Sequence, residues 1–195
     1  MRFIFLCGFL IISSPAFSAD ECVALSDDKK RLACYDMKYK PIDKTERVGK
    51  WIVSSEVSKV DDSQAVYLQV VSNESIEKRS GGSDTATLTL RCQERETSLL
   101  INLAGEFLAD ISGYGDVTYR IDNQKAETRA FTASTNNQSL GLWSGKKAIP
   151  MIKSLLDHDV MLVRATPYNQ SPETVTFPIT GLKGVIEPLR NACGW

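Results

Sequence analysis

Apolar and polar positions alternate along most of the chain after Gly49, with short polar turns between the alternating segments. Thr85–Cys92, for example, has an apolar side chain at every second position and is rich in β-branched residues, as half-buried strands are. A more polar stretch at 72–83, which contains two adjacent glycines, predicts a flexible loop. The pattern predicts strands at 51–57, 65–71, 85–92, 97–103, 117–121, 127–132, 139–143, 160–166 and 174–179.

A helical pattern occupies the N-terminal residues 19–40. Asp27 or Asp28 can cap a helix here, and Pro41 ends it because the residue before a proline disfavours helical backbone. A polar link at 41–48 precedes the first strand. We therefore expect 19–40 to form a small helical segment separate from the rest of the chain.

Two more helices are predicted in the C-terminal part. Apolar residues recur at helical spacing over about 148–157, where Pro150 fits the first turn. A second helix, over about 182–192, contains Pro188, which should kink it or end it early. Many antiparallel strands and a few helices predict the α+β class: a mostly antiparallel β-sandwich or bent sheet, with a small N-terminal helical segment and one or two C-terminal helices. We expect 49–195 to be a single β-rich domain.

The first eighteen residues have the pattern of a secretory signal peptide. Arg2 supplies a positive charge, residues 3–12 are almost wholly apolar, and Ala16–Ser18 places small residues at the −3 and −1 positions of a cleavage site. The apolar run is too short to cross a membrane. We expect cleavage just before Ala19, which also removes Cys7 and leaves about 175 residues, enough for one domain with a real core.

Four cysteines remain after this cleavage, and an even number in an exported chain predicts disulfides. Of the three possible pairings we favour Cys22–Cys34, whose members share the helical segment, and Cys92–Cys193. On one straight helix, twelve residues would separate Cys22 and Cys34 by about 18 Å. A bridge needs Cα atoms within about 7 Å, so the chain must fold back between them, and we expect the turn at Ser26–Asp28.

The charge of the mature chain is close to neutral, because removing the signal leaves 22 basic residues against 24 acidic ones. Both signs are interspersed, which gives no electrostatic footprint for nucleic acid. Elsewhere the sequence has no apolar run of about eighteen residues, so no membrane span is predicted.

His158 is the single histidine, which removes most Ser-His-Asp and Cys-His arrangements and most zinc sites. It lies between two aspartates in a segment that joins a helix to a strand, where a solvated turn is favoured over a general base. The cysteines show no C-x-x-C spacing. We therefore expect no catalytic residue, no metal site and no cofactor.

Trp143, Ser144 and Gly145 are the first candidate for a partner contact. They stand where a strand gives way to a helix, and such connections carry binding groups more often than the elements do. Core packing is the default for a tryptophan, so the alternative is that Trp143 lies in the core. The polar stretch 72–83 is the second candidate.

Several short motifs, in a fixed order, resemble the VasI (also TagO) family of type VI secretion-associated proteins. The match covers nearly all of the mature chain. The motifs are Cys22, Arg31–Asp36, Gly49–Trp51, Val57–Ser63, Leu90–Cys92, Leu142–Ser144, Gly181–Leu182, Leu189–Arg190 and Cys193–Trp195.

The resemblance implies a periplasmic protein of the bacterial envelope, related to a contractile export machine. The family's matching cysteines support the pairing favoured above, and the family offers no established catalytic residue to transfer. The leading hypothesis is a non-enzymatic accessory protein that contacts other envelope proteins, type VI components among them. Two alternatives are a hydrolase or inhibitor acting on the cell wall, and a prophage-encoded protein that binds an envelope component.

Overall fold

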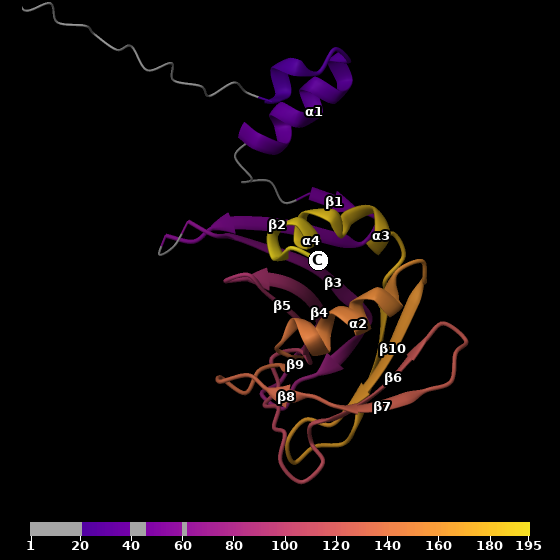
Figure 1. Ribbon diagram of the computed structural model, residues 1–195. Coiled ribbons are helices and arrows are strands. Elements are labelled where there is room, and N and C mark those ends of the chain that lie inside the picture. The colour runs from indigo at the N-terminus through magenta and orange to yellow at the C-terminus, as the bar shows by residue number, and fades with distance from the viewer. Residues whose placement is uncertain (1–20, 40–45, 60–61) are drawn as a thin grey trace, which may run out of the picture. The chain divides into compact units, whose positions relative to one another are not determined.

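The computed structural model describes residues 21–39, 46–59 and 62–195 (Figure 1). The chain divides into two compact units, Met1–Pro41 and Ile42–Trp195. The proposed signal segment lies outside the described residues.

The first unit contains a short 3-10 helix, η1 (Glu21–Ala24), followed by α1 (Asp28–Tyr39). Asp27 caps α1, since its Oδ1 accepts hydrogen bonds from the backbone N–H groups of Lys29 and Lys30 at 2.9 and 3.0 Å. Cys22 is buried and disulfide-bonded. The side chain of Cys34 lies outside the described part, so the pairing of these two cysteines stays a prediction.

The second unit is built from two antiparallel sheets, which confirms the predicted α+β class with sandwich-like sheets. The first sheet has the strand order β1-β2-β3-β4-β5-β9-β8, and the second has the order β11-β10-β6-β7. The first consists of β1 (Glu46–Val48), β2 (Trp51–Val57), β3 (Gln64–Glu77), β4 (Ser83–Gln93), β5 (Glu96–Asn102), β9 (Leu140–Leu142) and β8 (Thr132–Ala133). The second consists of β11 (Glu173–Pro178), β10 (Val160–Ala165), β6 (Asp116–Ile121) and β7 (Glu127–Ala130).

The described residues of this unit also form the helices α2 (Gly145–Leu155), α3 (Leu182–Val185) and α4 (Glu187–Cys193). Helices α2 and α4 pack on the first sheet, against β5 and against β3 and β4 respectively, as Figure 1 also shows. The expected break at Pro188 is present, because α3 ends at Val185 and Pro188 stands in the first turn of α4. None of the helices in the described part has the length and apolar character needed to cross a bilayer.

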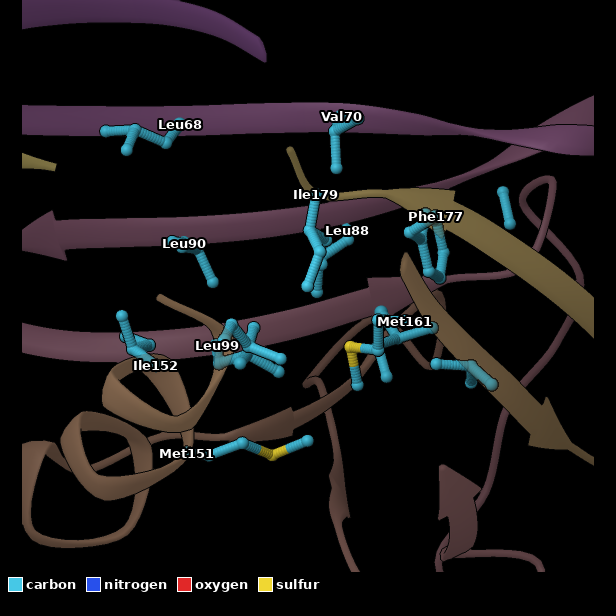
Figure 2. Packing of buried hydrophobic residues seen from close by; sticks show 14 of the residues in the cluster. Leu68, Val70, Leu88, Leu90, Leu99, Met151, Ile152, Met161, Phe177 and Ile179 are labelled. Atoms are coloured by element: carbon cyan, nitrogen blue, oxygen red, sulfur yellow. The ribbon is translucent and has the colours of Figure 1, made fainter. Parts of the chain in front are cut away.

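The core lies between the inner face of the first sheet and a layer formed by the second sheet and the helices. Alternation decides which side chains enter it: the even-numbered residues of β4 are buried from Ala86 to Cys92, and the odd-numbered ones are half-buried on the other face. Figure 2 shows this packing through Leu68, Leu88, Leu90 and Leu99 of the first sheet, Ile152 of α2, and Met161 and Phe177 of the second sheet.

One expected strand is divided between the two sheets. The pattern predicted a single strand at 127–132, whereas β7 pairs with β6 in the second sheet and β8 pairs with β9 in the first. Phe131 lies between them, is only 3% exposed, and donates its backbone N–H to the carbonyl oxygen of Gly115. Burial of this ring at the crossing point explains why the chain changes sheets there.

The expectation of a flexible loop over the whole of 72–83 is wrong for 72–77, which belongs to β3, whereas 78–82 forms the turn between β3 and β4. β3 continues to Glu77, and its pairing with β4 shifts register between Val71 and Ser75. Ser72 is buried there: its hydroxyl donates to the carbonyl oxygen of Glu74 at 2.6 Å and accepts from the N–H of Ala86 at 2.9 Å. Ser72 thus satisfies backbone groups at a β-bulge, and a partner contact in 72–83 stays a prediction.

Candidate functional site

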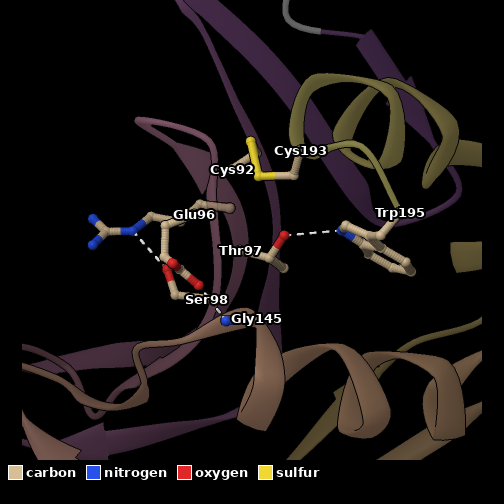
Figure 3. The surroundings of a disulfide bond; sticks show 8 residues. Cys92, Glu96, Thr97, Ser98, Gly145, Cys193 and Trp195 are labelled. Carbon is tan, nitrogen blue, oxygen red and sulfur yellow. Dashed lines mark hydrogen bonds between the residues drawn. A yellow bond between two sulfur atoms is a disulfide. The ribbon is translucent and has the colours of Figure 1, made fainter.

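The Cys92–Cys193 bridge is present and joins β4 to α4, with the two Cα atoms 5.7 Å apart (Figure 3). Trp195 lies beside it and donates its indole N–H to the hydroxyl of Thr97 at 2.9 Å. Two cations, Lys153 Nζ and the Arg190 guanidinium, lie 5.6 and 5.5 Å from the ring centroid of Trp195. This end of the chain is therefore anchored to the sheet and has a structural role.

Trp143, Ser144 and Gly145 form the connection from β9 to α2, as expected. Ser144 is the N-cap residue, but its hydroxyl does not cap the helix. The carboxylate of Glu96, at the start of β5, instead accepts the backbone N–H of Gly145 (Figure 3). A carboxylate at a helix N-terminus is stabilising, so Ser144 and Gly145 help to begin α2. Of the three residues, Trp143 therefore remains the candidate for contact with a partner protein.

Trp143 is half-buried and lies outside the main core, on the outer face of the first sheet. Its indole N–H donates to the carbonyl oxygen of Thr132 at 2.8 Å, which occupies an acceptor on the edge strand β8. The ring lies over Gly141, where an added Cβ would come within 2.8 Å of Trp143 Cε2 and of Leu100 Cδ2. The absence of a side chain at Gly141 thus makes room for the ring.

Arg91 is the neighbour of Trp143 that the sequence did not single out. It stands in a cross-strand row on the outer face, opposite Tyr67 of β3 on one side and Ser98 of β5 on the other. Its Nε donates to the hydroxyl of Ser98 at 2.9 Å, and its guanidinium carbon lies 5.4 Å from the ring centroid of Trp143. The only sequence signal for it is a charged residue on the solvent side of an alternating strand.

Tyr67 extends this row towards β2. Its hydroxyl donates to Glu56 at 3.0 Å. Burial, followed by the hydrogen bond and the charge of Glu56, raises the pKa of Tyr67 above 10.0, while Arg91 opposes this rise. Tyr67 is therefore a neutral hydrogen-bonding group at neutral pH.

Two open hollows flank Arg91 and Trp143, which line both of them. The larger has a volume of about 580 Å³ and extends to the turn between β8 and β9, and the smaller has about 280 Å³ and extends to the β4–β5 turn. The larger is lined by Arg91, Leu100, Ala133, Ser134, Thr135, Asn136, Ser139 and Trp143. We call Arg91, Trp143 and the larger hollow the Arg91–Trp143 site.

His158 is held more firmly than a solvated turn would require. Its Nδ1 lies 2.7 Å from Oδ2 of Asp122, and its Nε2 lies 3.3 Å from Nε2 of Gln124. The hydrogen bond from His158, followed by that from the N–H of Val160, holds the pKa of Asp122 below its ordinary 3.8. The pair joins the end of β6 to the start of β10. Within the described residues, no group of three or more His, Cys, Asp and Glu side chains is placed to hold a metal ion.

A second exposed apolar cluster lies on the loops that follow β5 and β10. Phe107 is 54% exposed and Ile111 is 58% exposed. Tyr168 packs against Phe107 and Tyr114, with ring centroids 5.9 and 5.1 Å away. These residues provide a comparison surface for experiments on Trp143.

Comparison with known proteins gives one family. The family model described as "Type VI secretion system VasI, EvfG, VC_A0118" matches residues 21–195. No curated protein matches the chain in sequence. Among solved structures, the crystal structure of invasion associated protein b from Bartonella henselae is 10% identical and covers 76% of this chain and 95% of its own, with a TM-score of 0.49. At this identity and TM-score the match gives no information on function.

Proposed function

The chain belongs to the VasI family and is a type VI secretion-associated protein, and from this premise we propose that it acts in the periplasm as a non-enzymatic accessory protein. In this proposal it serves the secretion system by contacting other envelope proteins through the Arg91–Trp143 site.

Two observations support a periplasmic location. Residues 1–18 have the pattern of a cleavable signal, and the Cys92–Cys193 bridge closes a sequence separation of 101 residues. Disulfides of this kind persist in oxidising compartments, of which the bacterial periplasm is one.

The surroundings of His158 support a non-enzymatic role. Both ring nitrogens face side chains that fix its position, Asp122 and Gln124, and in the described part of the chain no serine, threonine or cysteine is among its hydrogen-bond partners. The arrangement serves to tie two strands of the second sheet together.

The observation that carries the proposed contact is the clustering of an arginine, a tryptophan and a tyrosine on the outer face of the first sheet. Arg91 lies opposite Tyr67 in the strand register and over the ring of Trp143. Trp, Tyr and Arg are the residue types most enriched among those that dominate binding energy at protein interfaces. The hollow beside them gives a partner side chain a place to insert.

Complementation of a deletion strain tests the proposal. Trp143→Ala should reduce export of a type VI substrate into the medium, while the protein still accumulates in the periplasm with a cooperative melting transition. Phe107→Ala is the matched control, because it removes another exposed aromatic ring from a different surface. Normal export with a folded Trp143→Ala protein would refute this contact, and loss of export with Phe107→Ala would place the contact on the other surface.

Gene neighbourhood tests the link to the secretion system independently. A position among type VI genes is the expected result. A position among phage structural genes, together with unchanged type VI export after deletion, would favour a prophage protein instead.

A further inference from the structure

The guanidinium of Arg91 is fixed in place but not neutralised. Its Nε is used by Ser98, and the group rests over the ring of Trp143. Its two terminal amino groups have no hydrogen-bond acceptor in the described part of the chain, and no carboxylate there lies within 4.0 Å. Four N–H donors therefore remain available on a half-buried cation.

Two carboxylates, Glu94 and Glu96, line the smaller hollow with Arg91, and in the described part of the chain neither forms an ion pair with it. Glu96 accepts the backbone N–H of Gly145, and Glu56 accepts the hydroxyl of Tyr67. A planar guanidinium that is held by one nitrogen and by stacking presents its other two nitrogens as a ready-made fork for a carboxylate. Because the fork is positioned before binding, less conformational entropy is lost when an anion arrives.

The larger hollow offers an apolar surface next to this fork. Leu100, Ala133 and Trp143 contribute apolar lining, and Arg91 is the one charged residue among those that line it. The turn between β8 and β9 that lines the hollow is held by internal hydrogen bonds, since the hydroxyl of Ser134 donates to Asn136 at 2.7 Å and accepts the N–H of Ser139 at 3.0 Å. A volume of about 580 Å³ is in the range of pockets that take small ligands or short peptide segments.

We propose that the Arg91–Trp143 site binds an acidic side chain of a partner protein, with its carboxylate on the terminal nitrogens of Arg91 and a neighbouring apolar side chain against Leu100 and Trp143. This inference rests on the proposed function, since it names the chemistry of that same contact. A lone cation beside apolar surface suits a carboxylate–apolar pair better than it suits nucleic acid, whose phosphates require several cations.

A titration with defined peptides tests the chemistry directly. The probes are acetyl-Gly-Glu-Leu-Gly-amide, its glutamine counterpart and sodium acetate, each added up to about 50 mM, well above the range in which millimolar contacts saturate. The readout is the NMR signal of the Trp143 indole N–H in the mature protein. We expect the acidic peptide to shift this signal with an affinity at least about tenfold higher than either other probe, as the loss of one charge-assisted contact implies.

Variants assign the binding to Arg91. Arg91→Gln should weaken the acidic peptide about tenfold or more, and Arg91→Lys should restore only part of the loss because an ammonium lacks the fork. Arg164→Gln is the matched control, since Arg164 is exposed on β10 in the other sheet. Equal binding of the two peptides, equal binding of acetate, or no shift at all would overturn the inference.

The same variants in cells separate this inference from the proposed function. If Trp143→Ala and Arg91→Gln both reduce export, both proposals stand. If Trp143→Ala reduces export and Arg91→Gln does not, the contact surface stands and the acidic partner is wrong. If neither variant affects export while both proteins remain folded, the proposed function itself fails.

Discussion

Gly141 offers a way to disturb the Arg91–Trp143 site without touching either residue. Its φ is outside the left-handed region, so alanine is compatible with the backbone there. The new Cβ would nevertheless lie 2.8 Å from Trp143 Cε2, 2.9 Å from Cζ2 and 2.8 Å from Leu100 Cδ2. Real Cβ atoms do not approach other heavy atoms so closely, so the indole must move and strain its bond to Thr132.

The size of the effect follows from two opposed terms. Overpacking at a filled position costs about 1–3 kcal/mol, whereas replacing glycine by alanine lowers the entropy of the unfolded chain and returns about 0.4–1 kcal/mol. We therefore expect Gly141→Ala to reduce the free energy of unfolding by about 1–2 kcal/mol and the melting temperature by roughly 2–8 °C. Urea unfolding, monitored by circular dichroism, measures this change in the free energy of unfolding.

Gly184→Ala is the matched control for this experiment. Gly184 has no heavy atom within 4 Å of the position of an added Cβ and lies in α3, so alanine there should stabilise by a few tenths to about 1 kcal/mol. In a Trp143→Ala background, the cost of Gly141→Ala should fall by about 1 kcal/mol, with the remainder due to Leu100. A Gly141→Ala protein as stable as the wild type, or the same cost in both backgrounds, would refute the assigned packing.

Four further predictions concern the rest of the molecule. Replacing Cys92 and Cys193 together by alanine should cost about 2–5 kcal/mol in urea unfolding, since the bridge closes a separation of 101 residues, and a loss below about 1 kcal/mol would contradict this. Asp122→Asn should flatten the fall of melting temperature between about pH 5 and pH 2. The reason is that the lowered pKa of Asp122 gives stability that is present above 3.8 and lost as the pH falls through the folded-state value. His158→Ala should flatten the same fall, because its hydrogen bond is the main cause of the shift, and should leave export intact; loss of export by a folded variant would favour an enzyme. N-terminal sequencing of the periplasmic protein should begin at Ala19, and a membrane-bound protein that keeps its signal segment would contradict this.

Local pattern placed most of the strands and helices. One helix boundary was wrong: α2 begins at Gly145, three residues before the expected start, so Pro150 stands inside the helix and not in its first turn. Alternation identified β4 and β5 as a hairpin because the face that a strand residue occupies depends only on whether its position is odd or even. The cap at Asp27 and the break before Pro188 were predictable because each depends on a residue's own side chain and its nearest neighbours. The even number of cysteines likewise predicted a bridge for Cys193, since pairing follows from composition and compartment.

The tertiary structure decided which groups the polar side chains bond to. Ser72 looked like a loop residue, yet its hydroxyl bonds with Ala86 across a bulge in a long strand. Glu96 caps a helix that begins 49 residues later. Asp122 and His158 meet because β6 and β10 pair.

The site itself follows the same division. The sequence marked Trp143 by its place between a strand and a helix, but not Arg91, which lies on another strand. Their meeting depends on the register of β4 with β5 and of β5 with β9, and on the missing side chain at Gly141. The register of the strands is fixed by burial of the whole inner face, to which every strand of the sheet contributes. The register therefore cannot be predicted from any local stretch of sequence.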